Sequence, residues 1–117
     1  MNERVVAIRR TFRELHESGC FMIPNPWDVG SARLLASLGF KALATTSSGF
    51  AWSRGRTDNG VTLEDALRHM EEMAAGVELP INADFEGGFA VAPEGVAASV
   101  AKFREVLGVS ASPRRDR

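Results

Sequence analysis

The sequence predicts an α/β fold, and three observations support this prediction. Short apolar runs that suit buried strands alternate with amphipathic stretches that suit helices. The connections between them are short, and most contain proline, glycine or serine, which favour turns. After an opening helix, the order strand, helix, strand, helix, strand, helix is typical of parallel βαβ units.

The composition is that of one small globular domain. Of the 117 residues, 44% are hydrophobic and 25% are charged. The formal net charge of -1 gives no basic field for nucleic acid, so a small molecule is the expected partner. Cys20 is the only cysteine, which excludes an intrachain disulfide and favours a reducing, cytoplasmic setting. No apolar run reaches the ~18 residues of a membrane span, so no membrane partner is expected.

Four stretches carry the periodicity or the end signals of helices. The first, Val5 to Leu15, places its apolar side chains on one face. The second follows Asp28 and the third follows Thr62, because the side-chain oxygen of each residue can accept from amides of the next turn. A fourth begins at Pro93, since proline is tolerated in the first turn of a helix. We expect His16 and His69 to occupy surface positions on helices.

Three short apolar runs are expected to form buried strands. They cover Cys20 to Ile23, Phe40 to Thr46 and Leu79 to Asp84. The second should end in a turn at residues 47–49, followed by a polar loop over residues 51–60. Cys20 begins the first strand, at the opposite end from the candidate ligands, so it is not expected to be a nucleophile.

The number of units is small for a closed parallel barrel. Such a barrel needs eight βα units and typically ~250 residues, whereas this sequence contains three units. Residues 108–117 turn abruptly polar and charged where a fourth strand would come, so we expect a disordered or frameshifted tail after residues 1–107. The alternative is the solvated terminus of a complete small domain.

An acidic segment ends the third predicted strand. Asn82, Asp84 and Glu86 are two residues apart, so in extended chain they would share one face with neighbours about 6.6 Å apart. Parallel α/β folds place ligands at this end of their strands. Oxygen side chains suit Mg²⁺, which needs only one or two protein carboxylates. The alternative is that these are ordinary turn residues.

Two further segments lie on the same predicted rim. Thr46-Ser47-Ser48-Gly49 offers hydroxyls and backbone amides that can hold a carboxylate or phosphonate oxygen. The following loop contains Asp58 together with Arg54 and Arg56, which could guide an anionic substrate. Taken alone, the first segment is better explained as a plain strand-ending turn and the second as a solvated loop.

Three segments together resemble one known family. They are Asn25 to Asp28, Gly39 to Phe50 and Ile81 to Phe89, in that order and each at a strand end. In these segments the sequence resembles the isocitrate lyase and phosphoenolpyruvate mutase superfamily. The resemblance covers roughly Phe12 to Leu107. It implies a partial (β/α)8 TIM barrel, made of the first three βα units plus an N-terminal helix.

The resemblance also implies a chemistry and a set of site residues. Members use Mg²⁺ to stabilise an enolate from a small 2-oxo or dicarboxylic acid while a C–C or P–C bond is cleaved or formed. The family's substrate-binding segment matches Ser47, Ser48, Gly49 and Phe50, and its metal-shell acids match Asp84 and Asp58. Asn82 departs from the pattern, because an aspartate usually stands there. We expect Glu86 to replace the lost charge through water.

The resemblance leaves several readings of the function open. The family's later metal-shell acid and its lysine and cysteine loop are absent from this sequence, so the chain alone is expected to be inactive and to associate through bare sheet edges. Full-length relatives are expected to be homo-oligomers. One alternative is a non-catalytic fragment that only associates. Another is a receiver-like signalling domain with Asp84 as phosphoacceptor, although no fifth strand with its lysine is visible.

Overall fold

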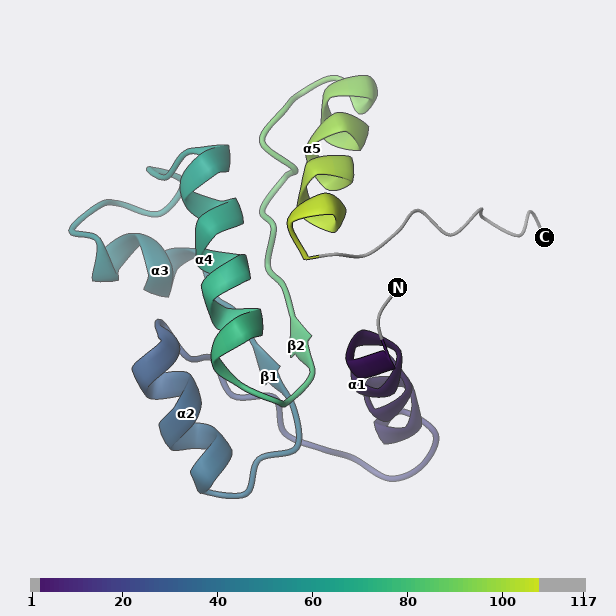
Figure 1. The fold of residues 1–117 in the computed structure, drawn as a ribbon. Helices are drawn as coiled ribbons and strands as arrows, with labels where there is room; N and C mark the ends of the chain where they lie inside the picture. Colours follow the sequence, from purple (N-terminus) through teal and green to yellow (C-terminus); the bar gives the residue numbers. More distant parts are fainter. Residues whose placement is uncertain (1–2, 108–117) are drawn as a thin grey trace.

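The computed structural model describes residues 3–107, which form an α/β architecture of five helices and a two-stranded parallel sheet (Figure 1). The predicted tail, residues 108–117, lies outside the described residues. The elements in chain order are α1 (Glu3–Leu15), α2 (Val29–Ser37), β1 (Leu43–Ala44), α3 (Ser47–Ser53), α4 (Leu63–Gly76), β2 (Ile81–Asn82) and α5 (Pro93–Val106).

The predicted helix starts are confirmed. Asp28 Oδ1 accepts a hydrogen bond from the Ser31 amide at 2.8 Å, and this bond holds the pKa of the Asp28 carboxyl below its usual value. Thr62 Oγ1 accepts from the Asp65 amide at 3.2 Å, and Asp65 Oδ2 in turn accepts from the Thr62 amide, also at 3.2 Å. Pro93 occupies the first turn of α5. Local side-chain chemistry therefore fixes where these helices begin.

The predicted strands are longer than those observed, and the first of them is wrong. The segment Cys20 to Ile23 is not a strand, although the chain just after it lies beside β1. There the Ala44 amide donates to the Pro24 carbonyl at 3.0 Å, and Asn25 Nδ2 donates to the Ala44 carbonyl at 2.9 Å. Because Pro24 and Pro26 have no amide hydrogen, this segment cannot continue a regular ladder.

The two strands pair in parallel, with Leu43 opposite Ile81 and Ala44 opposite Asn82. The Leu43 amide donates to the Pro80 carbonyl and the Thr45 amide donates to the Asn82 carbonyl, both at 2.9 Å. Since parallel strands end at the same edge of a sheet, the chain after β1 emerges next to the chain after β2.

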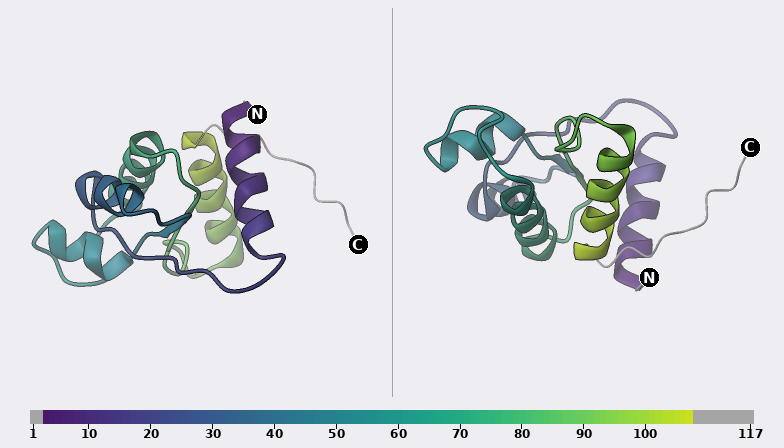
Figure 2. Two further views of the ribbon diagram at one scale, coloured as in Figure 1. Left: turned by 90° about the horizontal axis from the view of Figure 1, so that it is seen from below. Right: turned by 90° about the horizontal axis from the view of Figure 1, so that it is seen from above.

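One side of the sheet is closely packed. Ala32, Leu43, Met73 and Val77 form a buried cluster between α2, β1 and α4. The views in Figure 2 place α2, α3 and α4 on one side of the strands and α1 with α5 on the other. Arg33 of α2 donates to the Gly76 carbonyl at 2.9 Å. Its positive charge therefore lies at the C-terminal end of α4, where it is favourable.

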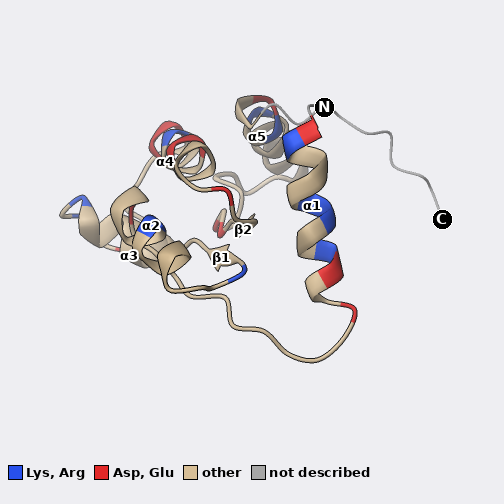
Figure 3. Ribbon diagram, turned by 60° about the horizontal axis from the view of Figure 1, so that its bottom comes forward, with Lys and Arg blue, Asp and Glu red and all other residues tan. Residues whose placement is uncertain are grey.

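The other side of the sheet is open. No residue of α1 is buried, and Figure 3 shows basic and acidic positions distributed along this helix. Arg4 anchors α1 by donating to the Ala74 and Val77 carbonyls at 3.1 and 3.0 Å. A cavity of about 470 Å³ lies between α1 and α5 along β2 and is lined largely by apolar side chains, including Ile8 and Phe103.

The chain after β1 is helical, which corrects the prediction of a turn followed by a loop from residue 51. Thr46 caps α3, and its Oγ1 accepts from the Gly49 amide at 3.3 Å. Phe50 and Ala51 are buried and form a second core cluster with Val61. Burial of this apolar pair stabilises a helix only two turns long, which the polar composition of the following residues concealed.

Candidate functional site

The candidate site lies where the chain leaves β1 and β2. Thr45 Oγ1 accepts a hydrogen bond from the Asp84 amide at 2.8 Å. In the opposite direction, the Ser47 amide at the start of α3 donates to Asp84 Oδ2 at 3.4 Å. Two segments that are 37 residues apart in the sequence are therefore joined at one point.

The chain beyond β2 does not stay extended, which corrects the expectation that Asn82, Asp84 and Glu86 share one face. Asn82 lines the large cavity beside α1 and α5, whereas Asp84 and Glu86 line a separate small hollow. Glu86 has a φ of 53° and its amide donates to Asp84 Oδ1 at 3.0 Å. Phe89 also has a positive φ, 58°. Left-handed residues other than glycine are strained and concentrate at functional sites.

Negative charge accumulates around this turn. Burial raises the pKa of the Glu86 carboxyl, and the carboxylates of Asp58 and Asp84 raise it further. Asp58, which comes from the loop after α3, is thus close enough to act on Glu86. Glu86 Oε1 is buried and has no hydrogen-bond partner. An unpartnered carboxylate oxygen among like charges is a position that a cation or a water molecule would stabilise.

The fit of this site to a metal ion is partial. Among residues 3–107, no three His, Cys, Asp or Glu side chains converge closely enough to hold an ion. Mg²⁺ keeps several waters and needs one or two carboxylates, and it can take its remaining ligands from a substrate. Asp84, Glu86 and Asp58 therefore offer part of a coordination shell, and Asp84 keeps acceptor capacity beyond its two amide bonds.

The predicted substrate segment, Ser47 to Phe50, forms the first turn of α3. Ser48 Oγ lies 3.3 Å from Thr46 Oγ1. Phe50 turns into the core, where its ring stacks on His69 with centroids 3.9 Å apart and planes 9° from parallel. The segment can therefore present hydroxyls to an oxyanion, but not the Phe50 ring, and the amides of Ser47, Gly49 and Phe50 already donate to acceptors within the chain.

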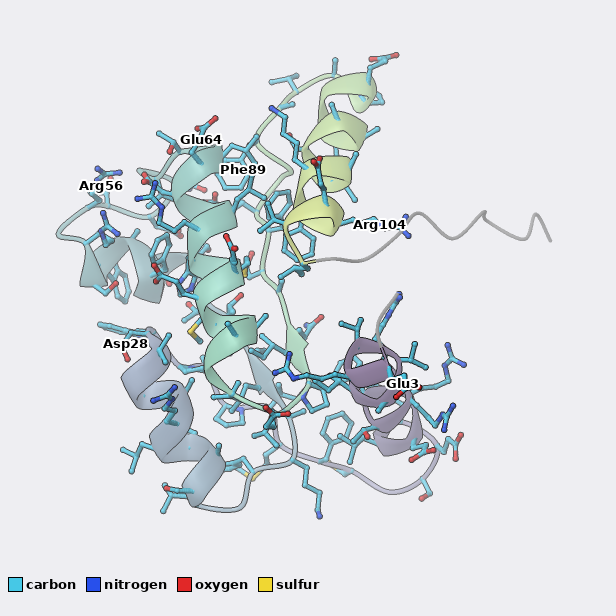
Figure 4. The ribbon with its side chains drawn as sticks, in the orientation of Figure 1. Glu3, Asp28, Arg56, Glu64, Phe89 and Arg104 are labelled. Carbon is cyan, nitrogen blue, oxygen red and sulfur yellow. The ribbon has the colours of Figure 1, made fainter. Side chains whose placement is uncertain are left out.

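Gly49 occupies a position that no larger residue fits. A Cβ there would collide with the Trp27 indole and would lie 2.7 Å from Thr46 Cγ2. Trp27, 42% exposed, also makes an edge contact with Trp52 of α3, with centroids 5.7 Å apart. In Figure 4, Asp28 marks the adjoining N-terminal end of α2. The segment before α2 thus covers one side of the substrate segment.

The prediction that His69 occupies a surface position is wrong. His69 is 5% exposed and lies on the apolar face of α4 with Met70 and Met73. Burial lowers the pKa of the imidazole, although the charges of Glu72 and Asp28 act in the opposite direction. The helical spacing from Ala66 to Met73 could have placed His69 on this face. His16 and Cys20 are exposed, and Cys20 is free.

His69 also borders the small hollow at the site. The hollow has a volume of about 10 Å³, and its other polar walls are Thr46, Ser47, Asp84 and Glu86. Phe89, labelled in Figure 4 where the chain after β2 passes α4, closes it with Phe50.

Within residues 3–107 no helix is long and apolar enough to cross a membrane.

Comparison with known proteins matches nearly the same region of the sequence as the family resemblance. The sequence profile of the phosphoenolpyruvate phosphomutase family matches residues 12–112. An uncharacterized protein of Mycobacterium tuberculosis is 33% identical over 93 residues, which cover 79% of this chain and 36% of that protein.

Two crystal structures have the same arrangement of elements. One, from Burkholderia cenocepacia J2315 and provisionally described as a lyase/mutase, is 45% identical with a TM-score of 0.84; the match covers 89% of this chain and 38% of that chain. The other is 2,3-dimethylmalate lyase, a member of the PEP mutase/isocitrate lyase superfamily, at 28% identity and a TM-score of 0.74; it covers 93% of this chain and 38% of that chain. The chain thus spans less than two fifths of these relatives and matches their N-terminal portion.

Proposed function

The chain belongs to the phosphoenolpyruvate phosphomutase family, and on this premise we propose that it supplies the first three βα units of a (β/α)8-barrel enzyme. The proposed enzyme is a lyase, mutase or hydrolase that acts on a small 2-oxo or dicarboxylic acid. The dicarboxylate 2,3-dimethylmalate named for one relative supports this substrate class.

The observation that carries the proposal is the junction between Ser47 and Asp84. It brings the amide end of α3 within 3.4 Å of a carboxylate at the end of β2. Parallel α/β folds bind ligands at this edge. Strain at Glu86 and its unpartnered Oε1 add a cost that a ligand would offset.

Each segment of the junction has its own role in the proposed site. The hydroxyls of Ser47 and Ser48 would bind and orient a carboxylate or phosphonate group of the substrate. Trp27 and the α3 helix would exclude water from one side of that group. Asp84 would hold its place through Thr45 and Ser47, so that its remaining lone pairs face the ligand.

Mg²⁺ is the metal that suits this donor set. Asp84 would bind it directly or through water, and Glu86 and Asp58 would contribute negative charge from the outer shell. When bound, the ion supplies positive charge that lowers the cost of an enolate oxygen on the substrate. The residues of this chain then bind and orient the substrate, while the remaining catalytic groups belong to later parts of the proposed barrel.

Metal binding by the 117-residue chain provides the test. Mn²⁺, a spectroscopic substitute for Mg²⁺, should bind with a broadened paramagnetic resonance signal, and oxalate should tighten this binding. Asp84→Asn should weaken Mn²⁺ binding at least tenfold. The matched control is Glu105→Gln, which removes an exposed carboxylate from α5 and should leave the affinity unchanged.

The competing candidate is a fragment that only associates. The open side of the sheet, where α1 has no buried residue, favours this candidate. It predicts no difference between Asp84→Asn and Glu105→Gln in Mn²⁺ affinity, together with association that increases with concentration in light scattering. Equal affinities in the two variants would therefore refute the proposed metal-dependent function.

A further inference from the structure

Two buried polar atoms in the described part of the chain lack a hydrogen-bond partner, and both belong to residues that line the same hollow. They are Nε2 of His69, on α4, and Oε1 of Glu86, in the turn after β2. An unpaired buried polar atom is costly, so two at one small hollow require a physical explanation.

The size and chemistry of the hollow suit one water molecule. Its volume of about 10 Å³ is close to the lower limit for a single water, roughly 10–15 Å³. A buried water typically has two to four polar partners. His69 Nε2 and Glu86 Oε1 provide two, and Thr46 and Ser47 line the same hollow.

We propose that His69 is a positioning residue of the candidate site, joined to Glu86 by one buried water and to the substrate segment by its stacking on Phe50. The ring stack holds Phe50, and Phe50 follows Ser47, Ser48 and Gly49 within α3. The water holds the Glu86 side chain. His69 therefore links the substrate segment of α3 to the turn at Glu86 from the side of α4, without touching the substrate.

The inference deepens the proposed function and rests on it only in treating the hollow as part of a binding site. The water bridge and the ring stack are properties of the folded chain. They can therefore be measured in EDTA without substrate, and failure of metal binding would leave them unaffected.

A double-mutant cycle tests the bridge. His69→Phe retains a flat ring and removes the nitrogen, while Glu86→Ala removes the other end. If one water joins them, His69→Phe should lower the urea midpoint, and the double variant should lose less than the sum of the two single changes, because either change alone strands the other partner.

The opposite results would overturn the bridge. If the hollow is dry, His69→Phe removes an unpaired polar atom and should raise the urea midpoint. Additive effects would equally exclude a shared water. The matched control cycle combines Glu86→Ala with His16→Phe, which alters an exposed histidine beside Phe12 and Phe21, and it should be additive.

Tryptophan fluorescence tests the stack separately. Trp27 and Trp52 are the only tryptophans, and Trp52 lies on α3 itself. His69→Leu, which removes the flat ring, should shift the emission maximum, whereas His69→Phe should keep that of the wild type. Identical spectra for the wild type, His69→Leu and His69→Phe would refute the positioning role. If His69→Leu fails to fold, an emission maximum of His69→Phe that differs from that of the wild type would refute it instead.

Discussion

Helices α1 and α4 are equally amphipathic and nearly equal in length, yet only α4 contains buried residues. The apolar face of α4 packs on the sheet and buries Ala66, His69, Met70 and Met73. α1 buries no residue and faces a cavity of about 470 Å³. An amphipathic sequence therefore shows which face of a helix can be buried, whereas the available partner decides how much of it is buried.

The difference divides the molecule into a packed side and an open side. The candidate site lies on the packed side, where Phe50 of α3 stacks on His69 of α4. The open side exposes the edge of β2 that does not pair with β1, and the proposed barrel would continue from this edge. Substitutions on the two sides should consequently have very different costs.

The largest expected effect compares two apolar truncations. Leu43→Ala removes a side chain with no exposed surface and should lower the free energy of unfolding by about 3 kcal/mol, because the packed side cannot collapse around the cavity. Ile8→Ala on α1 should cost about 1 kcal/mol, because Ile8 is only partly buried. Urea unfolding of both variants measures the difference. Equal costs would remove the distinction between the two sides.

The next effect compares two glycines at helix N-termini. Gly49→Ala should destabilise the protein by about 2 kcal/mol, because its Cβ would overlap the Trp27 indole and Thr46. Gly30→Ala in α2 is the control, since its nearest contact is Asp28 Oδ1 at 3.6 Å and alanine favours a helix. The control should be neutral or stabilising by up to about 1 kcal/mol. Thermal unfolding measures the midpoints of both variants. Equal midpoints would contradict the close packing of Trp27 against Gly49.

Features with local causes could be predicted from the sequence. The starts of α2 and α4 depend on Asp28 and Thr62, whose side chains bond amides three residues away. The strands were predicted too long because their ends depend on pairing with distant segments. Pro24, for instance, accepts a bond from Ala44 but cannot extend the ladder.

The site shows the same division between local and distant causes. The order of the segments placed Ser47 and Asp84 on one rim, and their hydrogen bond confirms that they meet. The spacing of Asn82, Asp84 and Glu86 did not reveal that the chain turns left-handed at Glu86, because glutamate gives no signal for that conformation. The burial of His69 depends on Phe50, a residue from another helix, although helical periodicity could have indicated its face.

A smaller effect tests the hydrogen bond behind the acidic turn. Thr45→Val keeps the shape of a side chain that is 4% exposed and removes the acceptor for the Asp84 amide, at a cost of about 1 kcal/mol. Thr11→Val on the exposed side of α1 is the matched control and should change stability by less than about 0.5 kcal/mol. Hydrogen exchange at the Asp84 amide should be faster in the first variant alone. Unchanged exchange would show that Thr45 does not hold this segment.

The smallest net effect is expected on acidification, because buried His69 and partly buried Glu86 respond in opposite directions. The pKa of His69 is lowered in the fold, so below about pH 6.5 the unfolded chain binds a proton that the folded chain does not. Stability therefore falls as the pH falls, until the pH is below the lowered pKa of the folded state. The pKa of Glu86 is raised, so the folded chain binds its proton first as the pH falls toward 4.5, and stability rises. Asp28 and Asp65, with lowered pKa values, lose their contribution only below about pH 3.8.

Urea midpoints at pH 7.5 and 5.5 in EDTA separate the two contributions. The wild type should be slightly less stable at pH 5.5. Glu86→Gln should lose at least as much stability as the wild type between the two pH values, since no raised Glu86 pKa then offsets His69, whereas His69→Phe should lose none. If His69→Phe lost as much stability as the wild type, the imidazole would not be the titrating group, and its burial against Phe50 would not set the pH dependence of stability.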